Sequence, residues 1–292
     1  MAFFWKRKHS TGSSHREQVV TAARRLYDKN ILAATDGNIS SKENDSQILI
    51  TPSGKQKAFL YPEEIILYNI KDKDSKQKVS SELAMHLQIY KSCPRASFVI
   101  HAHPPSAIAW TIAFPKLKNL PYDILPELIL AVGSIPFVPY ARPGTEDMAK
   151  NIIPYLPHHK TLILTRHGAL SWGESMEEAL NGMERIEHTA HILMMAKKLR
   201  GLTTLPQDEI QYLQEKRKQI GLPLPCPPWP LPPGTSDKPD SEGKVVVFKP
   251  SGIVVDQEPG KVEAEWWEQA LEESLGATES TRVYQYRDMI KF

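Results

Sequence analysis

The sequence predicts an α/β protein with a mixed, largely antiparallel central sheet flanked by helices, followed by a proline-rich linker and a small C-terminal extension. Three observations predict this fold. Helical and strand patterns are interspersed along the first 220 residues, the strand patterns are too short and hairpin-like for strict βαβ repetition, and the composition changes sharply after residue 201. With 292 residues, 41% of them hydrophobic, the chain can form a sizeable core.

Helices are predicted where apolar side chains recur at helical spacing behind a capping residue or a proline. Ser80 and Ser81 are N-cap candidates for a helix that runs to about Tyr90, because a serine oxygen accepts hydrogen bonds from first-turn amides, and Pro94 forbids continuation. The other predicted helices cover residues 15–29, about 106–113, a stretch from about 145, 177–199 and 207–219.

Strands are predicted where short β-branched and aliphatic runs end at turn residues. The turn at residues 35–38 leads into one such strand, and the Lys/Asp-rich residues 71–78 form a solvated loop after another. The remaining predicted strands cover residues 47–51, 65–70, 97–101, 135–138, 161–164 and 169–172.

The C-terminal part of the chain differs in composition from the rest. Eight prolines within residues 221–239 indicate a linker or a wrapping arm in extended polyproline geometry. After it, two apolar runs and a helical pattern at 263–275 predict a small ββα element. The predicted organisation is a flexible tail (1–14), a large domain (15–220), a linker (221–243) and an extension (244–292).

Charge and cysteine content exclude several classes of partner. Lys and Arg total 36 against 34 Asp and Glu, so a net charge of +2 gives no general attraction to nucleic acid. Two widely spaced cysteines fit a reducing compartment, and no apolar stretch of signal-peptide or membrane-spanning length occurs. We therefore expect a cytoplasmic protein without stable membrane association.

Three histidines form the sharpest local signal. His101 and His103 end a predicted strand, where residues two apart project to the same face and can converge on one cation. Alone, this pair would fit two hydrogen-bonded surface histidines equally well. His167, however, also follows a strand and precedes Gly168, which allows close backbone approach. Three neutral imidazoles and one open position describe a catalytic zinc site.

Further motifs occur in a fixed order around these histidines. They are Gly37-Asn38-Ile39-Ser40, Thr51-Pro52-Ser53-Gly54 and Ser80-Ser81-Glu82. Together with the His-x-His-Pro and His-Gly motifs, they make residues 15–220 similar to the class II aldolase/adducin family, typified by fuculose-phosphate aldolase. Each motif alone is weak, and their joint occurrence in this order carries the resemblance.

The resemblance implies roles for individual residues. His101, His103 and His167 become the ligands of one Zn²⁺ per chain, and Glu82 becomes the catalytic acid/base beside it. The positions matching the substrate-phosphate site are Asn38, Ser53, Gly54, Ser80 and Ser81. Such residues bind an anion through hydroxyls, amides and a helix N-terminus. Their more common structural role is to form turns and cap helices. The family also implies a homotetramer with active sites at subunit boundaries and a small phosphorylated sugar or hydroxy-carbonyl substrate.

The reaction is left open by two residues. Zinc acting as a Lewis acid stabilises the enediolate formed in aldol cleavage of a ketose phosphate, and this reaction is the primary expectation. Leu125, however, stands where fuculose-phosphate aldolase has a tyrosine, and Glu127 stands where the related methylthioribulose-phosphate dehydratases carry a catalytic glutamate. Dehydration and pentulose-phosphate 4-epimerisation are therefore alternatives, as is a non-catalytic, adducin-like binding module. Glu127 also fits an ordinary helix-start carboxylate.

The remaining histidines carry weaker signals. His188 and His191 lie three residues apart on a predicted helix, where packing or surface duty is expected. His158 and His159 stand in a proline-flanked loop and are expected to be solvated. His86 follows Glu82 by one helical turn and can approach that carboxylate, with core or surface duty as the default.

Overall fold

The computed structural model describes residues 14–72, 77–156, 158–199, 201–222, 245–248 and 254–257. The chain divides into two compact units, Met1–Thr235 and Ser236–Phe292. The described part of the second unit is an antiparallel pair of strands, β8 (Val245–Phe248) and β9 (Val254–Gln257). Most of the predicted linker and the helix predicted at 263–275 lie outside the described residues.

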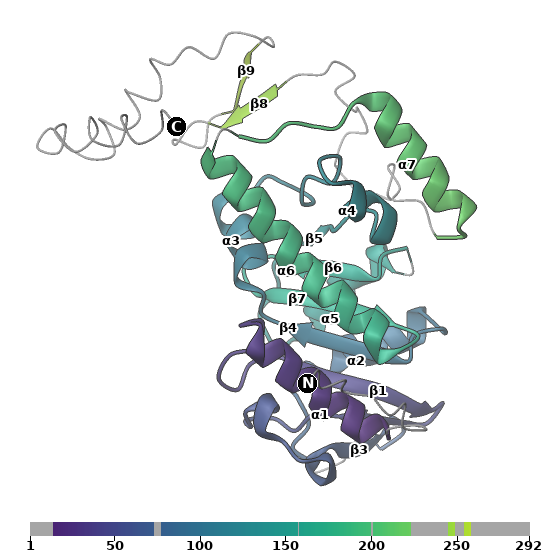
Figure 1. Cartoon of the computed structure of the whole chain (residues 1–292). Helices are drawn as coiled ribbons and strands as arrows, with labels where there is room; N and C mark the ends of the chain where they lie inside the picture. The colour runs from purple at the N-terminus through teal and green to yellow at the C-terminus, as the bar shows by residue number, and fades with distance from the viewer. Residues whose placement is uncertain are drawn as a thin grey trace, which may run out of the picture. The chain divides into compact units, whose positions relative to one another are not determined.

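The first unit contains a seven-stranded sheet in the order β3-β2-β1-β4-β7-β6-β5 (Figure 1). Every neighbouring pair is antiparallel except β5 and β6, which are parallel. The predicted mixed, largely antiparallel sheet flanked by helices is therefore confirmed. The strands are β1 (Asn38–Asn44), β2 (Gln47–Ile50), β3 (Ile66–Asn69), β4 (Phe98–Ala102), β5 (Phe137–Val138), β6 (Thr161–Leu164) and β7 (Gly168–Gly173).

The bounds of the helices agree with those predicted from the sequence within a few residues. The exception is the short α4, for which the sequence indicated only a possible helix start at Glu127. The helices are α1 (His15–Asp28), α2 (Leu83–Ser92), α3 (Pro105–Ala113), α4 (Pro126–Ala131), α5 (Glu146–Ile152), α6 (Met176–Leu199) and α7 (Gln207–Gln219), with single 3₁₀ turns at Lys57–Phe59, Pro62–Glu64 and Ile153–Tyr155.

The predicted start of α2 is wrong. Glu82 is the N-cap residue, and no side chain caps the first turn. The Ser80 hydroxyl instead accepts hydrogen bonds from the Glu82 backbone amide and from the Asn38 side chain. The Ser80 oxygen is thus shared between a local backbone amide and a tertiary contact.

Helices cover both faces of the sheet, and alternate residues of each strand pack on opposite faces. On β4, Phe98 and Ile100 belong to the core shared with α1, α3 and α6. Val99 belongs to the second core, which the sheet shares with α2 and α5. His101 is two residues from Val99 on the same strand, so its side chain also projects toward the α2 side of the sheet.

Helix α7 packs on α4 through a small apolar cluster of Ile129, Ile210 and Leu213. Arg217 on α7 is buried, and its guanidinium donates to the carbonyl oxygens of Leu130 and Val132. These bonds satisfy carbonyl groups at the end of α4 that have no partner within the helix. No helix in the described residues is both long and apolar enough to cross a lipid bilayer.

Candidate metal and anion site

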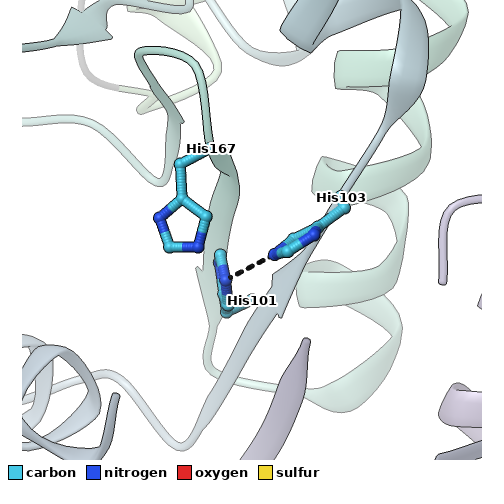
Figure 2. Close-up of side chains that lie close together, drawn as sticks. All are labelled: His101, His103 and His167. Atoms are coloured by element: carbon cyan, nitrogen blue, oxygen red, sulfur yellow. Dashed lines mark hydrogen bonds between the residues drawn. The ribbon is translucent and has the colours of Figure 1, made fainter. Parts of the chain in front are cut away.

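The sheet topology brings the three histidines together, although His167 is far from the other two in sequence. Strand β4 pairs with β7, which places His101 opposite Leu170 and Ala102 opposite Ala169. His167 occupies the turn between β6 and β7, immediately before β7 begins. One ligand nitrogen from each of the three histidines lies within 4.8 Å of the others, and Figure 2 shows the three rings turned toward a common point. The predicted convergence is therefore present.

Gly168 allows this convergence because no side chain fits at its position. A Cβ atom there would lie 2.6 Å from the Ala102 carbonyl oxygen, 2.7 Å from Cδ2 of His103 and 2.9 Å from Cε1 of His101. Real Cβ atoms essentially never approach other atoms this closely. The glycine of the His-Gly motif is therefore required by packing against the two histidines on β4.

The hydrogen bonding of His101 favours a cation at this point. His101 is fully buried, and its Nδ1 donates to the Ala169 carbonyl oxygen at 2.9 Å, so a neutral ring presents an unprotonated Nε2. That Nε2 lies 3.1 Å from Nε2 of His103 and 3.1 Å from Oε2 of Glu82. A cation held between these atoms would be bound by the imidazole lone pairs and the Glu82 carboxylate that face one another. The all-nitrogen donor set fits a divalent zinc ion.

Glu82 closes the site on the side of α2. Its Oε1 lies 3.0 Å from Nε2 of His167, and its Oε2 accepts a hydrogen bond of 2.8 Å from the Asn38 amide. Burial alone would raise the pKa of Glu82, but the neighbouring His101, His167 and Asn38 outweigh burial and hold the pKa well below its usual range. Glu82 is therefore ionised at neutral pH.

His103 is suited to ligand duty by its own environment. Burial and the neighbouring His101 and His167 rings lower the pKa of His103 to about 4, so its ring is neutral at pH 7. A neutral imidazole is the form that binds metals. Its Nδ1 lies 3.5 Å from Oδ2 of Asp36, a carboxylate that the sequence analysis did not single out. Carboxylates in this position commonly orient metal-binding histidines.

A chain of buried polar groups runs from Glu82 into the protein interior. Asn38 contacts His86 through Oδ1, and Nδ1 of His86 lies 2.6 Å from Oγ of Ser40. Ser40 in turn lies 2.7 Å from the Tyr90 hydroxyl. Asn38 and Ser40 are opposite His101 and Val99 in the β1–β4 register, so they share the face covered by α2. His86 is thus a core residue that reaches Glu82 through Asn38.

The candidate anion-binding residues lie in two connected groups. Asn38 and Ser80 are buried and bonded to each other at 2.9 Å beside Glu82. Ser53, Gly54 and Ser81 are exposed. A bridge between Pro52 and Val79, together with a bond from the Ser53 amide to the Lys78 carbonyl oxygen, holds the 52–54 turn beside the segment that precedes Ser80.

Glu127 is not brought to the histidines within the described part of one chain. It is exposed in the first turn of α4 and lines a cavity of about 880 Å³ together with Lys29 and several α6 residues. None of the three converging histidines lines that cavity. His188 and His191 do, and both are exposed, as expected for surface residues.

One expectation for the remaining histidines is wrong. His158 is exposed, but His159 is buried, with 6% of its surface accessible, and its carbonyl oxygen accepts a hydrogen bond from Nε1 of Trp172. Burial lowers the pKa of His159 to about 4. A second unexpected buried residue is Lys57, whose ammonium group donates to the Thr35 carbonyl oxygen next to Asp36. Neither could be found from local sequence, because tertiary packing buries both.

Comparisons with known proteins agree with the geometry. The model of the class II aldolase and adducin N-terminal domain matches residues 17–194. The chain is 29% identical over 188 residues to the 3-oxo-tetronate 4-phosphate decarboxylase of Escherichia coli, covering 62% of this chain and 87% of the relative. It is 33% identical over 172 residues to the L-fuculose phosphate aldolase of Methanococcus vannielii, covering 58% and 91%.

Solved structures share the fold of the first unit. YgbL from Escherichia coli superposes with a TM-score of 0.62 at 27% identity, covering 68% of this chain and 96% of YgbL. The L-fuculose-1-phosphate aldolase of Thermus thermophilus superposes with a TM-score of 0.55 at 28% identity, covering 63% and 95%. The relatives thus carry two different reactions, and decarboxylation was not among the reactions considered from the sequence.

Proposed function

Since this chain belongs to the class II aldolase and adducin family, we propose that it is a zinc-dependent lyase that breaks a carbon–carbon bond in a small phosphorylated hydroxy-carbonyl compound. The observation that carries the proposal is the meeting of three imidazole nitrogens, within 4.8 Å of one another, with the ionised Glu82. We propose His101, His103 and His167 as the ligands of one zinc ion per chain. A bound zinc ion would act as a Lewis acid toward substrate oxygens that gain negative charge.

Glu82 is the proposed proton carrier. Because its carboxylate is ionised, it acts as the base in the direction that joins two carbon fragments and, once protonated, as the acid in the direction that separates them. The proposed phosphate site lies in the connected segments beside Glu82 and comprises the buried Asn38 and Ser80 and the exposed Ser53, Gly54 and Ser81. No formal cation is required, since hydroxyl and amide donors bind such anions.

Aldol cleavage of a ketose phosphate is the first candidate reaction, supported by the similarity to L-fuculose phosphate aldolases. Decarboxylation is a second candidate, supported by the similarity to 3-oxo-tetronate 4-phosphate decarboxylases. In a 3-oxo acid, loss of CO₂ leaves negative charge on the carbon next to the carbonyl, the same position that carries the charge in aldol cleavage. One proton carrier at Glu82 therefore serves both reactions.

Dehydration and epimerisation have weaker support. A dehydratase role for Glu127 requires it to reach the metal from another copy of the chain, because in a single chain it lines a separate cavity on α4 and α6. Such a contribution would be consistent with the proposed homotetramer. Cytoplasmic location is proposed on the same family grounds, and the adducin-like binding role is disfavoured by the complete set of ionisable site residues.

Product analysis tests the proposal. Zinc-loaded full-length protein is incubated with a panel of ketose phosphates and with 3-oxo-tetronate 4-phosphate, and aldehyde, CO₂ and dehydrated product are measured separately. We expect aldehyde or CO₂ from at least one substrate and loss of that product in Glu82→Gln. Dehydrated product alone, abolished by Glu127→Gln, would replace carbon–carbon cleavage with dehydration. No turnover by the zinc-loaded protein across substrates of both classes would favour the binding module.

A further inference from the structure

The buried chain Tyr90, Ser40, His86 and Asn38 has only one hydrogen-bond direction that satisfies all its members. The Asn38 side chain contacts His86 with one end and both Ser80 and Glu82 with the other. Nδ2 of Asn38 donates to Oε2 of Glu82 at 2.8 Å and to Oγ of Ser80 at 2.9 Å. The NH₂ group of Asn38 therefore faces Glu82 and Ser80, and its oxygen faces His86.

The orientation of Asn38 fixes the tautomer of His86. The Asn38 oxygen needs a donor, so Nε2 of His86 carries the proton. Burial lowers the pKa of His86 to about 3, which leaves the ring neutral and its Nδ1 an acceptor. Nδ1 then accepts from the Ser40 hydroxyl, and Ser40 accepts from Tyr90, whose pKa is raised by burial so that it keeps its proton.

The same direction determines what Ser80 can do. Both hydrogens of the Asn38 amide are used, one by Glu82 and one by Ser80, so the Asn38 side chain has no donor left for a ligand. Oγ of Ser80 accepts from Asn38 at 2.9 Å and from the Glu82 backbone amide at 3.2 Å. Its two lone pairs are occupied, and its hydrogen has no acceptor among the residues that the structure describes.

We infer that His86 is a positioning residue that orients Asn38 and thereby leaves the Ser80 hydroxyl hydrogen free to bind an oxyanion of the substrate. The inference rests on the proposed anion site and refines it, because Asn38 then acts through Ser80 instead of touching the phosphate. If the hydrogen bonds ran in the opposite direction, the Asn38 oxygen would face the Glu82 carboxylate. The Ser80 hydroxyl would then donate its hydrogen to that oxygen. The reversed direction would therefore remove the donor and place two acceptors in contact.

Inorganic phosphate is the probe for the test, and its dissociation constant is measured by calorimetry with the full-length protein as purified, with metal content determined in parallel. Ser80→Ala should weaken phosphate binding about tenfold, because a hydrogen bond to a charged group is stronger than one between two neutral groups. His86→Leu should weaken it by a similar factor without touching the anion. The double variant should bind no more weakly than Ser80→Ala, because both changes remove the same donor.

Two further variants separate positioning from loosening of the core. His86→Gln keeps a donor toward Asn38 and an acceptor toward Ser40, so it should restore most of the affinity lost in His86→Leu. Tyr90→Phe removes a hydroxyl from the same buried chain but leaves Ser40 able to donate to His86, so affinity should stay within about twofold. If His86→Leu does not fold, Ser40→Ala takes its place, because it removes the donor that holds Nδ1 of His86 as an acceptor.

Three outcomes would overturn the inference. They are equal weakening by Tyr90→Phe and His86→Leu, additive losses in the double variant, and unchanged phosphate binding in Ser80→Ala. The last result, if accompanied by intact zinc content and turnover, would reject the anion role of Ser80 while leaving the proposed lyase activity standing. Loss of turnover on every substrate with these phosphate effects intact would reject the reaction and leave the inference standing.

Discussion

Replacing Gly168 by alanine should weaken metal binding as well as lower stability. The new methyl group would lie 2.7 Å from Cδ2 of His103, so that ring must retreat by about 0.7 Å to reach ordinary contact distance. Metal–nitrogen distances tolerate deviations of only about 0.2 Å. We expect a loss of zinc affinity on the order of 10–100-fold, together with about 1–3 kcal/mol of lost stability from overpacking.

Gly173→Ala at the other end of β7 is the matched control. A Cβ atom there would lie 2.8 Å from the Ala179 amide nitrogen and 2.8 Å from Cβ of Glu178, at the start of α6 and away from the histidines. Zinc affinity is measured by competition with a chelator, and stability by thermal unfolding of the metal-free proteins. Both variants should lose stability, and only Gly168→Ala should lose zinc affinity. Equal zinc affinity in Gly168→Ala and wild type would refute the packing argument.

Three further changes have defined outcomes. Glu82→Gln should lower kcat by about 10²–10⁴-fold with zinc content unchanged, because it removes the proton carrier and none of the three imidazoles; a loss below about fivefold would contradict this role. His159 has a pKa of about 4 in the folded chain against 6.5 for the unfolded one, so protons bind preferentially to the unfolded chain and stability falls as pH drops from about 6.5 to 4. The fall amounts to at most about 1.4 kcal/mol per pH unit from this group, and urea unfolding should show a shallower pH dependence in His159→Gln. Arg217→Met should cost about 1–3 kcal/mol by leaving the Leu130 and Val132 carbonyl groups without donors, and urea unfolding that matches wild type would contradict this.

The histidine cluster could be predicted from the sequence because its geometry is mostly local. His101 and His103 share a strand face by the two-residue period, and His167 is marked by the glycine that follows it. The pairing of β4 with β7, which joins the two groups, is not readable from spacing. The family resemblance supplied that step.

The features that sequence reasoning missed depend on tertiary register. Ser80 looked like a helix cap, but α2 begins later, with Glu82 as its N-cap, and the β1–β4 pairing places Asn38 where it donates to the serine oxygen. The same register, together with the packing of α2 on the sheet, places His86 between Asn38 and Ser40. The spacing of one helical turn from Glu82 did not predict these two contacts. His159 looked solvated in its loop, but it is buried, and its carbonyl oxygen accepts a hydrogen bond from Trp172 on β7.

Metal stoichiometry of the purified full-length chain tests the central claim most directly. The account predicts about one zinc ion per folded chain, lost in His101→Ala, His103→Ala and His167→Ala. His188→Ala, which removes an exposed histidine from α6, should retain it. Folded wild-type protein that binds no divalent metal, or alanine variants that keep their zinc, would contradict the claim that these three histidines form a metal site.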